Sequence, residues 1–164
     1  MELIFSRWMP ECLGTHSEET RLMQFRGEGI FRNDEQLHMN GPEVFGFTIR
    51  EVPSLLGELL EFSGWKTDQV DKFIFHQANE YMLKYLIKRM KLPKDKAPIS
   101  LAETGNTSSA SIPMTVSKIG MDSQIGLISK WVFCGFGVGF SWGAVTLETN
   151  DSFITDLVHV SHEH

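Results

Sequence analysis

Residues 72–90 read KFIFHQANEYMLKYLIKRM and contain the strand-to-helix step that decides the fold. The run KFIFHQ is aromatic and β-branched without clean alternation, which is typical of a strand buried on both faces of a parallel sheet. Asn79 offers a side-chain cap for the helix that follows, and Leu92-Pro93 ends that helix. Its apolar positions recur at helical spacing: Met82, Leu83, Leu86, Ile87 and Met90.

A longer helix is predicted before this strand. Asn40 is placed to cap it, Pro42 is tolerated in its first turn, and Glu43 completes a capping box. We expect the helix to end near Gly64 and to bend at Pro53, which removes a hydrogen bond from the helix interior. The apolar stripe is broad enough to be covered on more than one side: Val44, Phe47, Val52, Leu55, Leu56, Leu59 and Phe62, widened by Phe45, Ile49 and Leu60.

After residue 90 the chain predicts a second strand at Pro98 to Leu101 and a helix that follows GNTSSAS and runs to about Ile119. Two strands follow, Lys130 to Gly135 and Gly139 to Glu148. The order α-β-α-β-α-β-β indicates a layered α/β domain with a mixed sheet, in which ligand groups gather at the carboxyl ends of strands. We therefore expect an irregular segment at 1–38, the α/β domain at 39–148 and a polar tail at 149–164.

Composition narrows the class of function. The 164 residues carry a net charge of −6 and a pI near 5.5, which argues against nucleic acid as a partner. No apolar run is long enough to span a membrane, and no signal peptide is recognisable. Cys12 and Cys134 are interpreted as free thiols, so a cytoplasmic location is expected. No metal is expected, because the histidines lack the paired spacing of a zinc site: His16 (four residues after Cys12), His159, His162 and His164.

Two familiar enzyme motifs are not supported. GFGVG at 135–139 precedes a strand rather than a helix, so it is not a nucleotide-binding fingerprint. The serine-hydrolase pattern G-x-S-x-G is absent from the sequence. The glycines are better explained by close approach of a substrate or a neighbouring strand to the backbone.

His76 and Asn106 are the candidate catalytic residues. Both are predicted at junctions between a strand and the following helix, which would place them at the same edge of the sheet. A lone histidine in this position is more often structural, but the pairing favours a site. A neutral imidazole N–H and an amide NH₂ are both donors, and two donors aimed at one oxygen form an oxyanion hole.

A basic stripe follows His76 along its helix. Lys84, Lys88 and Lys91 share one face, and Arg89, Lys94 and Lys96 lie nearby. A solvated helix face and a surface for an anionic partner both remain open.

Several ordered motifs resemble the C-terminal half of 3-oxoacyl-(acyl-carrier-protein) synthase III, a condensing enzyme with the thiolase-like fold. They are NGPEVF at 40–45, HQAN at 76–79, GNTSSASIP at 105–113 and GFGVGFSWG at 135–143. The resemblance implies an acyltransferase in which His76 and Asn106 hydrogen-bond the malonyl thioester oxygen while carbon dioxide leaves. The nucleophilic cysteine of the family belongs to the N-terminal half, which this sequence does not match.

The resemblance also implies partners and supporting residues. Coenzyme A and phosphopantetheine thioesters are expected as substrates, with no bound cofactor. Acyl-carrier protein, acyl-CoA and either the other half or a second copy in a dimer are expected as partners. Phe140 is expected beside the histidine, with Gly137 and Gly139 in support, while Lys84, Lys88 and Arg89 are expected to dock the carrier. Tyr81 stands where the family often has arginine, which weakens the docking prediction, and Cys134 is interpreted as core. The alternative is a non-catalytic module that binds a full-length synthase or the carrier.

Overall fold

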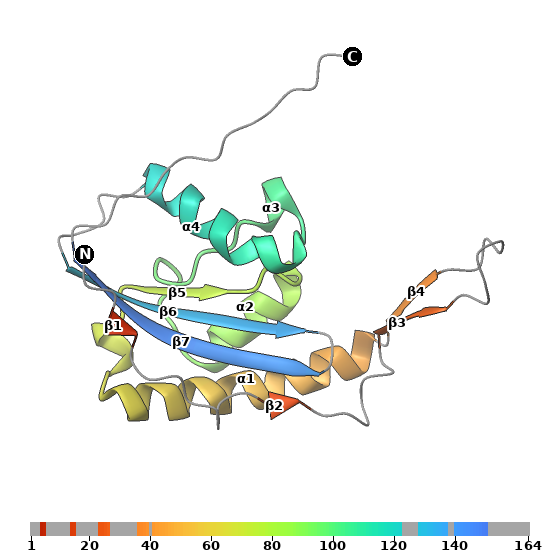
Figure 1. Cartoon of the computed structure of the whole chain (residues 1–164), viewed down its shortest axis with the longest axis horizontal. Helices are drawn as coiled ribbons and strands as arrows, with labels where there is room; N and C mark the ends of the chain where they lie inside the picture. Colours follow the sequence, from red (N-terminus) through yellow and green to blue (C-terminus); the bar gives the residue numbers. More distant parts are fainter. Residues whose placement is uncertain are drawn as a thin grey trace, which may run out of the picture.

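The computed structural model describes residues 4–5, 14–15, 23–26, 36–39, 41–122, 128–137 and 140–150. Its centre is a mixed sheet of three strands, β5 (Lys72–Phe75), β6 (Ile128–Gly137) and β7 (Ser141–Asn150). β5 runs parallel to β6, and β6 pairs with β7 as an antiparallel hairpin (Figure 1). Two-residue strands, β1 (Ile4–Phe5) and β2 (Gly14–Thr15), add to the free edge of β7.

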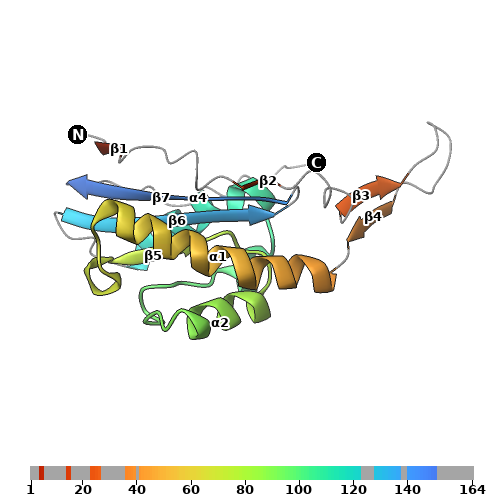
Figure 2. The same ribbon diagram turned by 90° about the horizontal axis from the view of Figure 1, so that it is seen from below.

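Helices cover both faces of this sheet. The long α1 (Gly41–Ser63) and α2 (Glu80–Arg89) lie on one face, and α4 (Ser111–Asp122) lies on the other (Figures 1 and 2). Three short turns complete the described helical structure: η3 (Thr67–Gln69), α3 (Leu101–Thr104) and η4 (Ser108–Ala110). The described part of the chain thus has three layers, which agrees with the layered α/β domain and mixed sheet predicted from the sequence.

Alternation along the strands divides the core into two clusters. Phe73 and Phe75 pack into the larger cluster with α1 and α2, while Ile74 points to α4. Trp131 on β6 joins the α4 cluster, and Val132 joins the larger one. The predicted burial of β5 on both faces is confirmed, because its last three residues are each 0–1% exposed.

The two helices around β5 follow the prediction closely. α1 ends at Ser63 and contains Pro53, although its predicted apolar position Phe62 is 44% exposed. α2 begins after Asn79, whose side-chain oxygen accepts a hydrogen bond from the Met82 N–H at 2.8 Å. The predicted cap Asn40 lies outside the described residues.

The predicted strand at residues 98–101 is wrong. The Phe73 N–H donates to the Lys96 carbonyl at 2.7 Å, so the chain does approach the edge of β5. Pro98 has no N–H to continue a ladder, and the Ser100 N–H donates instead to the side chain of Gln77 at 2.9 Å. The segment therefore turns into α3, and Asn106 lies between α3 and η4 rather than after a strand.

The described residues of the segment predicted to be irregular, together with Met39, form four short strands. β1 and β2 extend the main sheet, and β3 (Met23–Arg26) pairs with β4 (Gln36–Met39) as an antiparallel hairpin. These strands were missed because their apolar runs are short and broken by glycines and charges. At the other end β7 continues to Asn150, and the remainder of the predicted tail lies outside the described residues.

Candidate active site

His76 is the first residue after β5, and hydrogen bonds fix both its backbone and its ring. Its N–H donates to the Cys134 carbonyl of β6 at 2.8 Å, which continues the parallel ladder by one residue. The ring nitrogen Nδ1 lies 2.8 Å from the hydroxyl of Ser111, the first residue of α4. Ser111 is buried at 2% exposure, whereas His76 is half-buried.

The surroundings of Ser111 select one tautomer of His76. The Ser111 oxygen accepts a hydrogen bond from the Gln77 N–H at 3.2 Å. Among the described residues Nδ1 of His76 is the acceptor within reach of the Ser111 proton, and a buried hydroxyl does not leave its proton unpaired. The hydroxyl therefore donates to Nδ1, and the neutral ring carries its proton on Nε2.

The charge state of the ring follows from its burial. Burial lowers the pKa of His76 below its usual value, and a hydrogen bond to the backbone of Ser108 opposes this only in part. The imidazole is thus neutral at pH 7, which leaves it one N–H donor and one acceptor.

Asn106 is held by the same turn. Its Oδ1 accepts a hydrogen bond from the Ser108 N–H at 2.9 Å. Ser108 has a φ of 54° and Gly105 a φ of 63°, so the chain turns sharply on either side of Asn106. The side chain is exposed, and no acceptor for its NH₂ group occurs in the described part of the chain.

Both side chains lie beside Ser108: the Asn106 Oδ1 accepts from the Ser108 N–H, and the Ser108 backbone acts to raise the pKa of the His76 ring. The protonated Nε2 of the histidine and the NH₂ of the asparagine are uncharged donors held by separate loops. Such a pair has the chemistry of an oxyanion hole. The catalytic role of the two residues stays a prediction.

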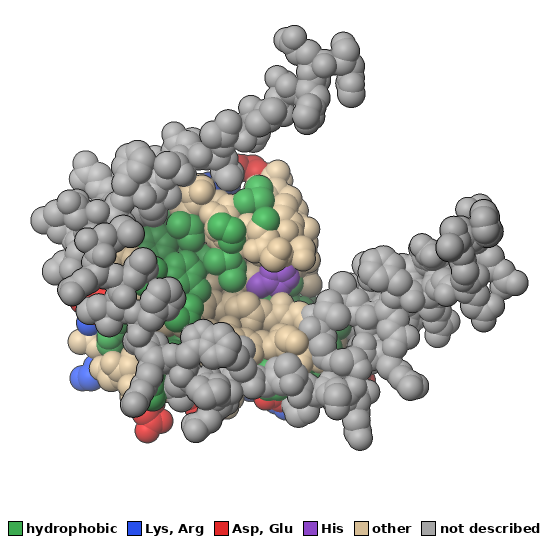
Figure 3. All heavy atoms as spheres, in the orientation of Figure 1, with side chains coloured by type: hydrophobic (Ala, Val, Ile, Leu, Met, Phe, Trp, Pro, Cys, Tyr) green, Lys and Arg blue, Asp and Glu red, His purple; other side chains and the backbone are tan. Residues whose placement is uncertain are grey.

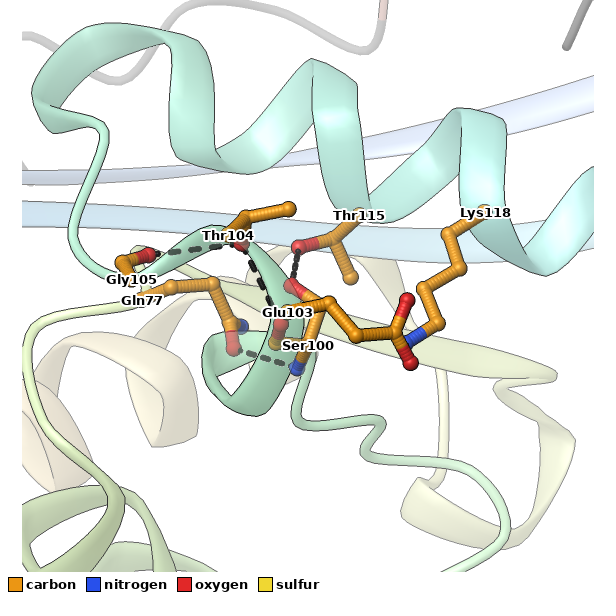
Figure 4. Close-up of polar contacts among 7 residues, drawn as sticks. All are labelled: Gln77, Ser100, Glu103, Thr104, Gly105, Thr115 and Lys118. Carbon is orange, nitrogen blue, oxygen red and sulfur yellow. Dashed lines mark hydrogen bonds and ion pairs between the residues drawn. The ribbon is translucent and has the colours of Figure 1, made fainter. Parts of the chain in front are cut away.

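A buried polar chain, which sequence reasoning missed, holds the two loops together (Figure 4). Gln77 is fully buried, donates to the Phe75 carbonyl at 2.9 Å and accepts from the Ser100 N–H. The Ser100 hydroxyl meets the Thr115 hydroxyl at 2.7 Å, and Thr115 donates to the Ser111 carbonyl at 2.8 Å. The chain therefore runs from the residue after His76, through the start of α3, to the serine that orients the imidazole.

The β6 glycines leave open space on the face of the sheet toward α4. A Cβ atom added at Gly135 or Gly137 would meet nothing within 4 Å, so neither glycine is required by packing within the described structure. By strand alternation both lie on the α4 side, the side of Ile74 and the His76 ring. Figure 3 shows histidine colour at the surface beside a patch of apolar side chains.

With this geometry established, comparison with known proteins gives the family. The model of the C-terminal region of 3-oxoacyl-(acyl-carrier-protein) synthase III matches residues 60–149, more than half of the chain. The chain belongs to this family.

Individual synthases III agree. A beta-ketoacyl-(acyl-carrier-protein) synthase III of Prochlorococcus marinus strain MIT 9313 is 38% identical over 141 residues, which cover 84% of this chain and 41% of the relative. The same enzyme of strain MIT 9312 is 38% identical over 112 residues, 68% of this chain and 33% of the relative.

Solved synthase structures have the same fold. The 3-oxoacyl-(acyl-carrier-protein) synthase of Burkholderia xenovorans LB400 superposes with a TM-score of 0.77 at 32% identity, covering 88% of this chain and 45% of that one. The synthase III of Pseudomonas aeruginosa PAO1 gives 0.76 at 26% identity, covering 85% and 43%. The chain spans less than half the length of these synthases, and the matches lie in their C-terminal part.

The role of Phe140 that the synthase III resemblance implies stays a prediction. The structure places the ring of Phe136 beside His76, with its centroid 5.5 Å from the imidazole at an interplanar angle of 80°. Phe140 instead stacks on Phe47 of α1, with centroids 4.1 Å apart. Gly137 lies on the same strand as Phe136, and Gly139 lies outside the described residues.

Cys134 lies in the larger core cluster, as expected. It is 1% exposed, and burial raises the pKa of its thiol to about 12. A thiol that does not ionise near neutral pH is a poor nucleophile. Cys12, His16, His159, His162 and His164 lie outside the described residues, and within the described ones no three His, Cys, Asp or Glu side chains are grouped to hold a metal ion.

The three predicted docking residues all lie on α2, but only one of them forms an ion pair with another described residue. Lys84 forms an exposed ion pair with Glu80 at 2.6 Å, whereas Lys88 and Arg89 are exposed near the C-terminal end of the helix. Lys96 does not belong to the stripe, because its ammonium group donates to the carbonyls of Asp68 and Val70. Tyr81 is 71% exposed and stacks on Phe45 of α1.

None of the described helices has the length and apolar composition of a membrane span.

Proposed function

We propose that this chain is the C-terminal catalytic half of a condensing enzyme of the synthase III type, an acyltransferase that joins an acyl group to malonyl-acyl-carrier protein with loss of carbon dioxide. The observation that carries the proposal is the meeting of His76 and Asn106 at Ser108, with Nε2 of the imidazole protonated and the amide NH₂ unengaged. Membership of the family supports the reaction class.

The pair would act on the oxygen of the malonyl thioester. The bond between the carboxylate carbon and the α-carbon breaks, carbon dioxide leaves, and the electron pair moves to the thioester oxygen as an enolate. Two N–H donors stabilise that negative charge, and loss of one such donor typically costs about 10²–10³ in kcat. The enolate carbon then attacks the acyl group on the cysteine of the N-terminal half, whose thiolate is the leaving group.

Substrates and partners follow from the same proposal. Thioesters of coenzyme A and phosphopantetheine are the substrates, no resident cofactor is required, and acyl-carrier protein and acyl-CoA deliver them. Lys84, Lys88 and Arg89 are the proposed contacts for the acidic carrier. The other half of the fold, or a second copy of the chain, completes the site, and a cytoplasmic location stays a prediction.

The test is release of carbon dioxide from malonyl-acyl-carrier protein by the chain combined with the N-terminal half of a relative. His76→Ala is expected to abolish it. Asn106→Asp keeps Oδ1 for the Ser108 N–H and loses the NH₂ donor, so it is expected to lower the rate by about 10²–10³. Ser109→Asp adds the same charge in the same exposed turn and is the matched control. Full activity of either site variant would refute the assignment.

A second candidate function is a non-catalytic module that binds a full-length synthase. Partly exposed apolar side chains on the α4 face favour it: Ile112, Val116, Phe133 and Leu147. The module predicts binding to the synthase without added decarboxylation, even when every missing half is supplied. Val116→Lys is expected to weaken that binding, measured by analytical ultracentrifugation. Turnover that depends on His76 would decide for the catalytic half.

A further inference from the structure

A hollow of about 790 Å³ lies against α2 and the segment that follows it, away from the residues of the candidate active site. Its floor is apolar: Ile87, Leu92, Ala97, Pro98 and Ile99. Four lysines and one carboxylate complete the lining: Lys84, Lys88, Lys91, Lys94 and Glu80. Volumes of this size are typical of sites for small molecules, which combine an apolar lining with a few polar groups.

α2 ends at the rim of this hollow in a Schellman motif that has a lysine at the position where glycine is usual. The Leu92 N–H donates to the Ile87 carbonyl at 3.0 Å, and the Lys91 N–H donates to the Lys88 carbonyl at 3.2 Å, the two bonds of a Schellman ending. Lys91 has a φ of 55° at the position where glycine is normally found, because left-handed backbone disfavours a side chain. The chain thus carries a cation at the rim where glycine would make the more stable turn.

The charge at the rim is not neutralised within the described structure. Lys84 pairs with Glu80 at 2.6 Å, but Lys88, Lys91 and Lys94 have no carboxylate at ion-pair distance among the described residues. The C-terminal end of a helix carries about half a negative charge, which offsets only a fraction of three lysines. Positive charge therefore stands over an apolar floor.

We propose that this hollow binds a single-chain amphipathic anion, a medium-chain fatty carboxylate. The alkyl chain lies on Ile87, Leu92 and Ala97, and the carboxylate lies among the ammonium groups of Lys88, Lys91 and Lys94. A concave site of this volume favours a small molecule over a folded protein, whose interfaces bury about 800 Å² per partner. The proposal does not depend on the condensing activity. Lys88 is also a proposed carrier contact, so the carboxylate and the carrier would compete for it.

Binding is tested by titrating the 164-residue chain with decanoate below its micelle concentration and following methyl resonances by NMR. Saturable shifts are expected at Ile87, Ala97 and Ile99, and none at Ile112 on α4. Lengthening the carboxylate from octanoate should raise affinity by up to about fourfold for each methylene that leaves water. Decanol and decyltrimethylammonium, which lack the anion, are expected to bind at least about fivefold more weakly.

Lys91→Gly separates binding from folding. Glycine suits the left-handed position, so this variant is expected to melt at a higher temperature while it binds decanoate about fivefold more weakly. Lys118→Gln on α4, which removes an ion pair with Glu103, is the matched control and is expected to bind normally. Equal affinity for decanoate and decanol, unchanged binding by Lys91→Gly, or shifts centred on Ile112 would overturn the proposal. Binding of an acidic peptide without binding of decanoate would overturn it as well and assign the surface to a protein partner.

Discussion

At the scale of single residues, the candidate site depends on Ser111 as much as on His76. The serine hydroxyl donates to Nδ1 and thereby keeps the proton of the neutral ring on Nε2. Ser111 does not touch the proposed substrate, so we interpret it as a positioning residue. An imidazole with its proton on Nδ1 would present an acceptor, not a donor, to an enolate oxygen.

Ser111→Ala is therefore expected to mix the tautomers of His76 without unfolding the chain. Loss of the hydroxyl leaves the Gln77 N–H without its acceptor, at a cost of about 1–3 kcal/mol in the free energy of unfolding. The ¹⁵N shifts of the ring are expected to move from the Nε2–H pattern toward an average of the two forms. In the carbon dioxide release assay with the N-terminal half, kcat is expected to fall while KM for malonyl-acyl-carrier protein changes little. A purely structural serine would lower stability and leave the ring shifts as they are.

The lowered pKa of His76 predicts the pH dependence of stability. In the folded state the ring gains its proton at a lower pH than in the unfolded chain, where the pKa is near 6.5. Between these two values the unfolded state binds more protons, so this residue makes the free energy of unfolding rise with pH. The contribution is complete above about pH 6.5 and is lost as the pH falls.

Urea unfolding at several pH values, compared between the chain and His76→Gln, measures this effect. The variant is expected to lose less stability than the parent when the pH falls from 7 toward 5, because glutamine does not titrate. Parallel curves for the two proteins would show that the imidazole is not held in its neutral form.

At the scale of elements, sequence patterns located most of the helices and long strands but not what joins them. α1 and α2 were found from periodicity and capping, β5 from an apolar run without alternation, α4 from the turn before it, and the β6–β7 hairpin from two apolar runs joined by glycines. The strand predicted at 98–101 failed because the Ser100 N–H is taken by Gln77, 23 residues away in sequence. A local pattern carries no information about such a partner.

The residues of the candidate site also fall into two groups, those that a sequence motif identifies and those that only the folded structure reveals. HQAN and GNTSSAS identified His76 and Asn106, whereas Gln77 and Ser111 act through contacts that only the folded chain creates. The resemblance pointed to Phe140 as the aromatic neighbour of the imidazole, whereas the contact between Phe136 and His76 became visible only in the register of β6 beside β5.

Gln77 is predicted to be the residue that couples the loop after β5 to the loop before α4. Gln77→Leu removes the acceptor of the Ser100 N–H and leaves that buried group unpaired, so the free energy of unfolding is expected to fall by about 2–3 kcal/mol. Ser54→Ala, which removes an exposed hydrogen bond to Glu58 on α1, serves as the control and is expected to change it by less than about 0.5 kcal/mol. Equal small losses in both variants, measured by urea unfolding, would mean that the polar chain does not hold the loops.

At the scale of the whole molecule, one part of the α4 face of the sheet, around Gly135 and Gly137, has no packing partner within the described structure. Gly135 and Gly137 lie on the α4 side with free space above them, near His76. Glycine weakens a strand, because it loses more backbone freedom on folding than residues with a side chain. Because two glycines stand at alternate positions on the same face, we expect a substrate or a partner to approach this face closely.

Gly137→Ala separates packing within the chain from the space that a substrate or a partner requires on this face. In the chain alone the added methyl group meets nothing within 4 Å, so the free energy of unfolding is expected to stay constant or rise by up to about 1 kcal/mol. Once the N-terminal half and malonyl-acyl-carrier protein are present, the same methyl group occupies space that the thioester or the partner backbone requires, and condensation is expected to fall at least about tenfold while the stability of the chain is retained. Gly57→Ala on the solvent side of α1, where an added Cβ also meets nothing, is the matched control and should leave condensation unchanged. If the Gly137→Ala variant catalyses condensation as fast as the parent, the space above Gly137 has no role in the reaction or in assembly.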